Sequence, residues 1–144
     1  MPESYVVGID GSEGSIRAAQ YAVDLASKSN AKVQVIHVLE WSPYSFLTNE
    51  ELAERHKRRK EELERAKSAI IDLVVTQLNT GDVTVEKEVR YGNIAEEIQR
   101  YCGDQGATHI CIGRQGSSGL TTRIFGSVAG ALVQTSNVPV TVVP

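Results

Sequence analysis

Five short runs rich in β-branched residues alternate with segments of helical spacing, and this alternation limits the possible folds more than any other feature of the chain. The runs predicted to be strands are 5–10, 32–39, 83–90, 108–113 and 138–143. The helices are expected over 14–29, 49–78, 94–102 and 127–135. Strands that alternate with helices form a mostly parallel sheet with helices on both faces. The sequence therefore predicts one α/β domain over residues 1–144, built as a three-layer sandwich.

The overall composition agrees with a globular domain and excludes several other classes of protein. Hydrophobic residues make up 41% of the 144 residues and charged residues 23%, which is too apolar for a disordered chain. No apolar run reaches the about 18 residues of a membrane span. The net charge of −3 gives no general attraction for nucleic acid. Since the first residues also lack the pattern of a signal peptide, we expect a cytoplasmic protein with no membrane or nucleic-acid partner.

The cysteines and histidines do not form a metal or disulfide pattern. Cys102 and Cys111 are too few for a disulfide framework and are expected to pack as small apolar groups. The histidines at 37, 56 and 109 lack the spacing of a zinc site. Two free cysteines suit a reducing compartment.

A charged stretch occupies the first half of the long helix expected over 49–78. Thr48 and Glu51 have the spacing of a capping box, which predicts the start of this helix. The basic run at 56–60 could meet an acidic partner, or it could be the solvated half of a helix that overhangs the core. Acidic residues on both sides of the run favour the solvated alternative.

The loop between the fourth strand and the last helix has the residues of a phosphate site. It contains glycines at 113, 116 and 126, and Ser127 opens the helix that follows. Ligands of parallel sheets bind beyond the carboxyl ends of the strands, and a helix start offers unpaired N–H groups to an anion. Glycine allows close backbone approach and a positive φ, and Ser127 could cap its helix. A flexible connecting loop without a ligand is the alternative.

Several catalytic motifs are absent from the chain. There is no Gly-x4-Gly-Lys-Ser/Thr loop and no Gly-x-Ser-x-Gly nucleophile elbow. A Ser-His-Asp site assembled from distant residues is disfavoured because His37 and His109 fall within predicted strands.

The spacing Gly113-x2-Gly116-x9-Gly126-Ser127 resembles the signature of the universal stress protein family, ATP-binding type. The opening Val-Gly-Ile-Asp-Gly-Ser and the final Ser-Asn-Val-Pro-Val-Thr-Val-Val are similar to the first and last strands of that family. The likeness covers essentially the whole chain. It implies a five-stranded parallel sheet of order 3-2-1-4-5, in which the first and fourth strands end at one crevice.

The resemblance also implies a set of nucleotide contacts. Asp10 lies by the nucleotide, next to Gly8, where many relatives carry proline, and the main chain near Val38 receives adenine. Ribose and phosphates are lined by Gly113, Arg114, Gly116 and Ser117, and phosphate is held by the amides of Gly126, Ser127 and Val128. Many relatives carry histidine in place of Gln115. Three structural alternatives remain open: Asp10 as a turn cap, Ser127 as a helix cap alone and Arg114 as a solvated loop residue. Trp41 and Tyr44 could cover the adenine or serve as packing anchors.

The function predicted from this resemblance is that of an ATP-binding stress-response regulator with at most slow ATP hydrolysis. Mg²⁺ is expected to accompany ATP, with Asp10 or Ser127 as its nearest oxygen ligands. The alternatives are a nucleotide-free dimeric adaptor, a binder of another adenine nucleotide such as cyclic AMP, and an adenylating enzyme of the pyrophosphatase-loop type. The last is disfavoured because Asp10-Gly-Ser-Glu-Gly-Ser15 lacks that loop's paired glycines.

The C-terminal run 138–143 predicts a homodimer. It is apolar but contains Pro139, which places it at a sheet edge or at a strand start. An unprotected apolar edge invites pairing, and a second copy of the same strand would cover it. The family resemblance implies the same contact.

Overall fold

All five strands pair in parallel in one sheet of order β3-β2-β1-β4-β5, as predicted. The computed structural model describes residues 3–40, 49–115 and 126–144. The strands are β1 (Ser4–Gly8), β2 (Lys32–Glu40), β3 (Val85–Gly92), β4 (His109–Gly113) and β5 (Val140–Val143).

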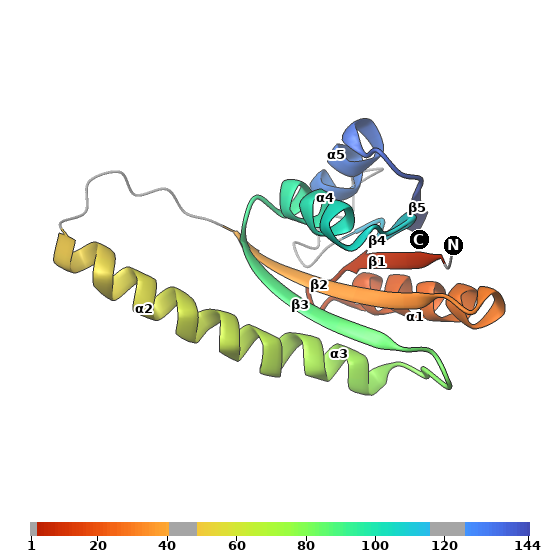
Figure 1. The fold of residues 1–144 in the computed structure, drawn as a ribbon, viewed down its shortest axis with the longest axis horizontal. Helices are drawn as coiled ribbons and strands as arrows, with labels where there is room; N and C mark the ends of the chain where they lie inside the picture. Colours follow the sequence, from red (N-terminus) through yellow and green to blue (C-terminus); the bar gives the residue numbers. More distant parts are fainter. Residues whose placement is uncertain (1–2, 41–48, 116–125) are drawn as a thin grey trace.

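Helices cover both faces of the sheet, which confirms the three-layer prediction (Figure 1). One face carries α1 (Glu13–Ser29) and the end of the long helical arm. The other face carries α4 (Ile94–Gln105) and α5 (Ser127–Thr135). The helical arm consists of α2 (Asn49–Ala66), the π-helical turn η1 (Lys67–Ile71) and α3 (Asp72–Gln77).

The side-chain alternation of β2 divides the interior into two cores. Val33 and Val35 belong to the first core, beneath α1, η1 and α3. Ile36 and Val38 point the other way, into the second core beneath α4 and α5. Each fully buried aliphatic side chain contributes roughly 1.5–3 kcal/mol relative to an exposed one. A parallel sheet buried on both faces therefore requires the nearly continuous apolar strands that the sequence shows.

Several predicted boundaries were wrong by about two residues. β1 ends at Gly8 instead of Asp10, although the Ile9 N–H still donates to the Ile36 carbonyl at 2.9 Å. β3 lies over Val85–Gly92, two residues later than expected. β5 begins at Val140, and the carbonyl of Pro139 already accepts from the Ile110 N–H at 3.0 Å. Strand ends depend on which neighbouring strand is still present, which alternation alone does not reveal.

The single helix expected over 49–78 was also wrong, because η1 interrupts it. The α2 portion extends beyond the sheet (Figure 1). The described side chains of Glu54, His56 and Lys60 are exposed, as the solvated alternative expects. The guanidinium of Arg59 lies 4.6 Å from the ring centroid of Tyr91, and the Tyr91 hydroxyl donates to Glu62 at 3.0 Å. These contacts join α2 to the margin of β3.

Both cysteines are buried and free, as predicted. Burial raises the pKa of the Cys111 thiol to about 11, and burial also raises the pKa of Cys102. Both thiols therefore remain protonated at neutral pH and pack as small apolar groups.

Candidate functional site

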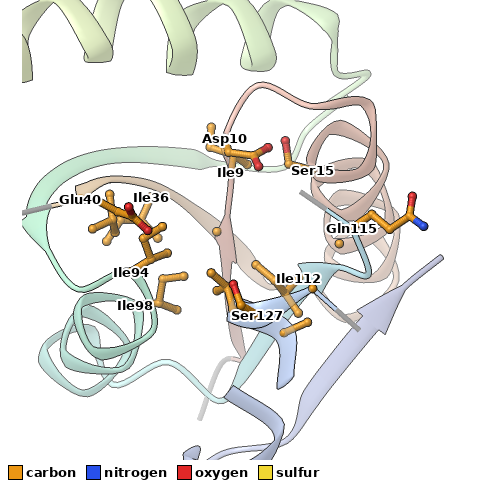
Figure 2. Close-up of a pocket in the computed structure, with 16 residues that line it drawn as sticks. Ile9, Asp10, Ser15, Ile36, Glu40, Ile94, Ile98, Ile112, Gln115 and Ser127 are labelled. Carbon is orange, nitrogen blue, oxygen red and sulfur yellow. The ribbon is translucent and has the colours of Figure 1, made fainter. Parts of the chain in front are cut away.

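A pocket of about 210 Å³ opens at the carboxyl ends of β1, β2 and β4 (Figure 2). Its walls also include the first residues of α4 and α5. The lining comprises Gly8, Ile9, Asp10, Ser15, Ile36, Val38, Glu40, Ile94, Ile98, Ile112, Gly113, Gln115, Gly126, Ser127, Val128 and Ala129. From β1 the chain adds β2 and β3 on one side of the sheet and β4 and β5 on the other. The pocket therefore lies at the switch point where open α/β sheets bind their ligands.

The floor of the pocket is apolar and depends on Gly8. A Cβ atom on Gly8 would lie 2.7 Å from Cδ1 of Ile98 and 3.0 Å from Cδ1 of Ile112. The missing side chain allows both isoleucines to approach the backbone at the end of β1. Gly8 therefore shapes the floor, and the ends of the isoleucine side chains are the groups that a larger residue would displace.

The turn between β1 and α1 is ordered by Asp10. Its Oδ1 accepts from the Ser12 N–H at 2.9 Å, and the Ser12 Oγ in turn accepts from the Ser15 N–H at 3.2 Å. Gly11, with φ of +84°, makes the turn that a residue with a side chain would resist. The turn-capping alternative for Asp10 is thus confirmed, and the same residue also lines the pocket.

Close backbone contact joins the start of α1 to the end of β4. A Cβ on Gly113 would lie 2.8 Å from the Gly14 carbonyl oxygen, and one on Gly14 would lie 2.7 Å from the Gln115 carbonyl oxygen. Neither Gly113 nor Gly126 has a positive φ, so the left-handed backbone considered for this loop is not found at these two positions. Gly113 is required first of all by the packing of two main-chain segments.

The bounds of α5 agree with the predicted range 127–135. The alternative that Ser127 serves as a helix cap alone is wrong, because the N-cap is Gly126, with no side-chain cap bond. Ser127 is instead the first helical residue, with an exposed side chain. The Gly126 N–H donates to the Arg114 carbonyl at 2.7 Å, and the first helical bond runs from the Gly130 N–H to the Gly126 carbonyl. First-turn N–H groups, including those of Ser127 and Val128, have no partner within the helix itself.

Arg114 does not line the pocket. Its side chain is exposed, and its main chain donates to the Val143 carbonyl at 2.8 Å. Gly116 and Ser117 lie outside the described residues, as do Thr48, Trp41 and Tyr44. The structure thus brings together Gly8, Asp10, Val38, Gly113, Gly126, Ser127 and Val128.

Val38 presents its main chain to the crevice. The Ile36 carbonyl faces β1, since it accepts from the Ile9 N–H. Main-chain groups two residues apart on a strand face the same side, so the N–H and C=O of Val38 also face the β1 side. The last residue pair between β1 and β2 is Gly8 with Ile36. The main-chain groups of Val38 therefore lie beyond the end of β1, at the pocket.

Sequence reasoning missed several lining residues, among them Ser15, Glu40, Gln115 and the isoleucines. Alternation along β2 could have found two of them, since Ile36 and Glu40 lie two residues before and after Val38. The α4 residues Ile94 and Ile98 carried no such signal. They reach the pocket because α4 packs across the end of β1, which only the tertiary arrangement shows.

The α4 wall is held by ion pairs to β3. Arg90 pairs with Asp104 at 3.1 Å and with Glu97 at 3.7 Å, and its guanidinium lies 4.9 Å from the ring centroid of Tyr101. Burial raises the pKa of Tyr101 to about 12. The Asn93 side chain caps α4 by accepting from the Glu96 N–H at 3.1 Å.

The charged side chains of the described lining are both acidic, Asp10 and Glu40. Within residues 3–40, 49–115 and 126–144, no group of three or more His, Cys, Asp or Glu side chains could hold a metal ion. The Nδ1 of His37 lies 2.8 Å from the Ile9 carbonyl oxygen, and that of His109 lies 2.9 Å from Oγ1 of Thr108. No helix in the described part of the chain has the length and apolarity to cross a bilayer.

The fold and the crevice define an open, parallel α/β protein with a pocket at its topological switch point, where such folds bind ligands. The model of the universal stress protein family matches residues 1–144, and the chain belongs to that family. It is 31% identical over 139 residues to universal stress protein MJ0531 of Methanocaldococcus jannaschii, covering 96% of this chain and 79% of that protein. It is 30% identical over 142 residues to universal stress protein YxiE of Bacillus subtilis, covering 96% of each chain.

Solved structures share the fold. Universal stress protein UspA from Lactobacillus plantarum aligns with a TM-score of 0.78 and 21% identity, covering 99% of this chain and 97% of that one. A universal stress protein in complex with cAMP aligns with a TM-score of 0.64 and 22% identity, covering 99% and 97%. The universal stress protein of Archaeoglobus fulgidus in complex with dAMP aligns with a TM-score of 0.59 and 22% identity, covering 100% and 98%.

Proposed function

We propose that the protein binds ATP in this pocket and acts as a regulator of the stress response, not as an enzyme. The observation that carries the proposal is the start of α5, which lines the pocket with no side-chain cap of its own. Unpaired N–H groups and the positive end of the helix dipole favour phosphate at such a position. The relatives in complex with cAMP and dAMP support an adenine nucleotide as the class of ligand.

The phosphate end of the site is assigned to the start of α5. The N–H groups of Gly126, Ser127 and Val128 and the Ser127 hydroxyl are the donors that the family resemblance implies, although the Gly126 N–H is already used by the Arg114 carbonyl. We therefore assign the phosphate contacts to Ser127 and Val128 first. Gly116 and Ser117 remain part of the proposal.

The base end is assigned to Val38. An N–H and a C=O on the same side of one strand can donate to N1 of adenine and accept from its N6 amine. Since β2 and β4 flank β1, the base and phosphate ends are separated by two strand spacings, about 10 Å. An extended nucleotide can span that distance, with its sugar above the apolar floor and Asp10 beside it.

Mg²⁺ is proposed to accompany the phosphates, with Asp10 and Ser127 as the oxygen-bearing residues of the lining that would approach it. We propose that ATP binding, and not ATP hydrolysis, is the central property. The proposal gives none of the described lining residues the role of a base that activates water. The free cysteines suit a reducing compartment, and we propose the cytoplasm.

Calorimetric titration of the full chain with ATP and Mg²⁺ tests this function, with GTP and cyclic AMP titrated in parallel. We expect saturable binding of one ATP per chain. Tighter binding of cyclic AMP than of ATP would favour the cyclic nucleotide as the ligand. An absence of heat with every adenine nucleotide would contradict the proposal and favour the nucleotide-free adaptor.

We also propose a homodimer through β5. β5 is an edge of the sheet, and its side toward β4 is used by Pro139 and Val143, whose carbonyls accept from Ile110 and Arg114. The main-chain groups of Val140 and Val142 consequently face away from β4. Pairing with a second β5 would satisfy these groups and protect an apolar edge.

Sedimentation of the unmodified protein at micromolar concentration tests the dimer, and a mass of 15.7 kDa throughout would contradict it. Val142→Pro removes one outward N–H while leaving the bonds from β5 to β4 in place, so it should shift the equilibrium toward monomer. The control is Val133→Ala, which changes an exposed position on α5 and should leave the dimer unchanged. Proline at position 133 would break α5 and is therefore not suitable.

A further inference from the structure

Glu40 holds an acidic group at the base end of the pocket. It is the last residue of β2 and points to the same face of the sheet as Ile36 and Val38, because side chains two residues apart share a face. Figure 2 shows it with Ile36 and Ile94, on the side of the pocket away from Gln115. Among the described residues, no hydrogen-bonding or ion-pair partner is found for its carboxylate.

The distribution of charge in the pocket restricts what can lie beside Glu40. The described lining has the carboxylates of Asp10 and Glu40 and no Lys, Arg or His side chain. A phosphate near Glu40 would be repelled, whereas the start of α5, two strands away, attracts it. This distribution of charge favours a ligand with its anionic end at α5 and an uncharged hydrogen-bond donor at Glu40.

We propose that Glu40 is a specificity-determining residue that accepts a hydrogen bond from the exocyclic amine of the bound base. This inference rests on the proposed nucleotide site and deepens it. The amine of adenine has two N–H bonds, and the Val38 carbonyl uses one of them. Glu40, two residues further along β2, supplies an acceptor for the second. Hydrogen bonds to a charged acceptor are stronger than neutral ones, so the site favours bases that carry an amine at this edge.

The test compares ATP with purine riboside triphosphate, which lacks only the amine, in titrations of the full chain with Mg²⁺. The variants are Glu40→Ala, which removes the acceptor, and Glu40→Gln, which keeps an uncharged oxygen acceptor. Both remove the same charge, so any general gain in triphosphate affinity affects the two ligands equally and cancels in their ratio. We expect the preference for ATP to fall about tenfold or more in Glu40→Ala and by a smaller factor in Glu40→Gln.

A control removes the same charge elsewhere. Glu64 is exposed on α2 and lies outside the pocket lining, so Glu64→Gln should leave the preference for ATP unchanged. If both Glu40 variants keep the preference of the parent protein, the inference is wrong while ATP binding stands. If the parent protein binds neither triphosphate, the proposed function fails together with the inference. Thermal melting without ligand shows whether the variants are folded.

Discussion

Two of the helices that begin at the pocket, α1 and α5, satisfy the N–H groups of their first turns in different ways. α1 follows β1 and is capped by the chain itself, through the Ser12 side chain and the turn ordered by Asp10. α5 begins at Gly126 with no side-chain cap bond. Both helix starts carry the same partial positive charge. This contrast is the reason for assigning the phosphate to α5, since part of the first turn of α1 is already satisfied by the chain itself.

The largest expected effect comes from giving α5 the cap that it lacks. Gly126→Asp places a carboxylate where it can accept from the first turn of α5, as Ser12 does in α1, and where it repels a phosphate. We expect ATP affinity to fall by more than about a hundredfold, since several charge-assisted bonds are lost together. Calorimetric titration measures this loss.

The matched control for that variant is Gly126→Ala. A Cβ at this position lies 3.1 Å from the Arg114 carbonyl oxygen, so alanine reports the cost of crowding without a charge. If Gly126→Asp binds ATP about as tightly as the parent protein, the phosphate lies elsewhere. The difference in capping between α1 and α5 would then be unrelated to ATP binding.

A smaller effect is expected from Ser127→Ala. Because Ser127 is the first residue of α5 and not its cap, its hydroxyl is not needed to cap the helix and can bind phosphate. Loss of one hydrogen bond to a charged group costs about 1.5–3 kcal/mol, which weakens ATP by about 10- to 100-fold. Thermal unfolding without ligand should be unchanged, and a clear drop in Tm would instead restore the cap role.

Replacing ATP by GTP separates the base end from the helix start. The two nucleotides carry the same triphosphate, but guanine reverses the donor and acceptor that would face Val38. A mismatched pair costs roughly 1–3 kcal/mol, so GTP should bind about 5- to 100-fold more weakly in a competition titration. Equal affinities would contradict the assignment of Val38 as the adenine contact.

The smallest expected effect on ATP binding comes from removing the side-chain cap of α1. Ser12→Ala removes the side chain that accepts from the Ser15 N–H and should lower the free energy of unfolding by about 1 kcal/mol. ATP affinity should stay within about twofold of the parent value, since the proposal places no phosphate at the first turn of α1. Denaturant unfolding and calorimetry together check this. A large loss of affinity with unchanged stability would make α1 the phosphate site instead.

Much of the fold could be predicted from the chain because the signals are local. Val33 and Val35 alternate with Gln34 and Ile36 along a buried strand, and Asn93 caps α4 through a neighbour three residues away. The π-helical turn η1 could not be predicted, since periodicity within 49–78 gives no sign of one extra residue per turn. The cap of α5 could not be predicted either, because Gly126 and Ser127 are both acceptable caps and the sequence does not choose between them.

The sequence by itself determined the alternation of strands and helices, the identity of the loop glycines and the family to which the chain belongs. The tertiary structure decided which residues meet. Gly113 packs against the main chain of Gly14, Ile98 reaches across the end of β1, and Glu40 joins Val38 in the pocket while Arg114 stays outside it. The physical reason is that periodicity and capping act between residues a few positions apart, whereas a pocket depends on the packing of segments that are distant in sequence.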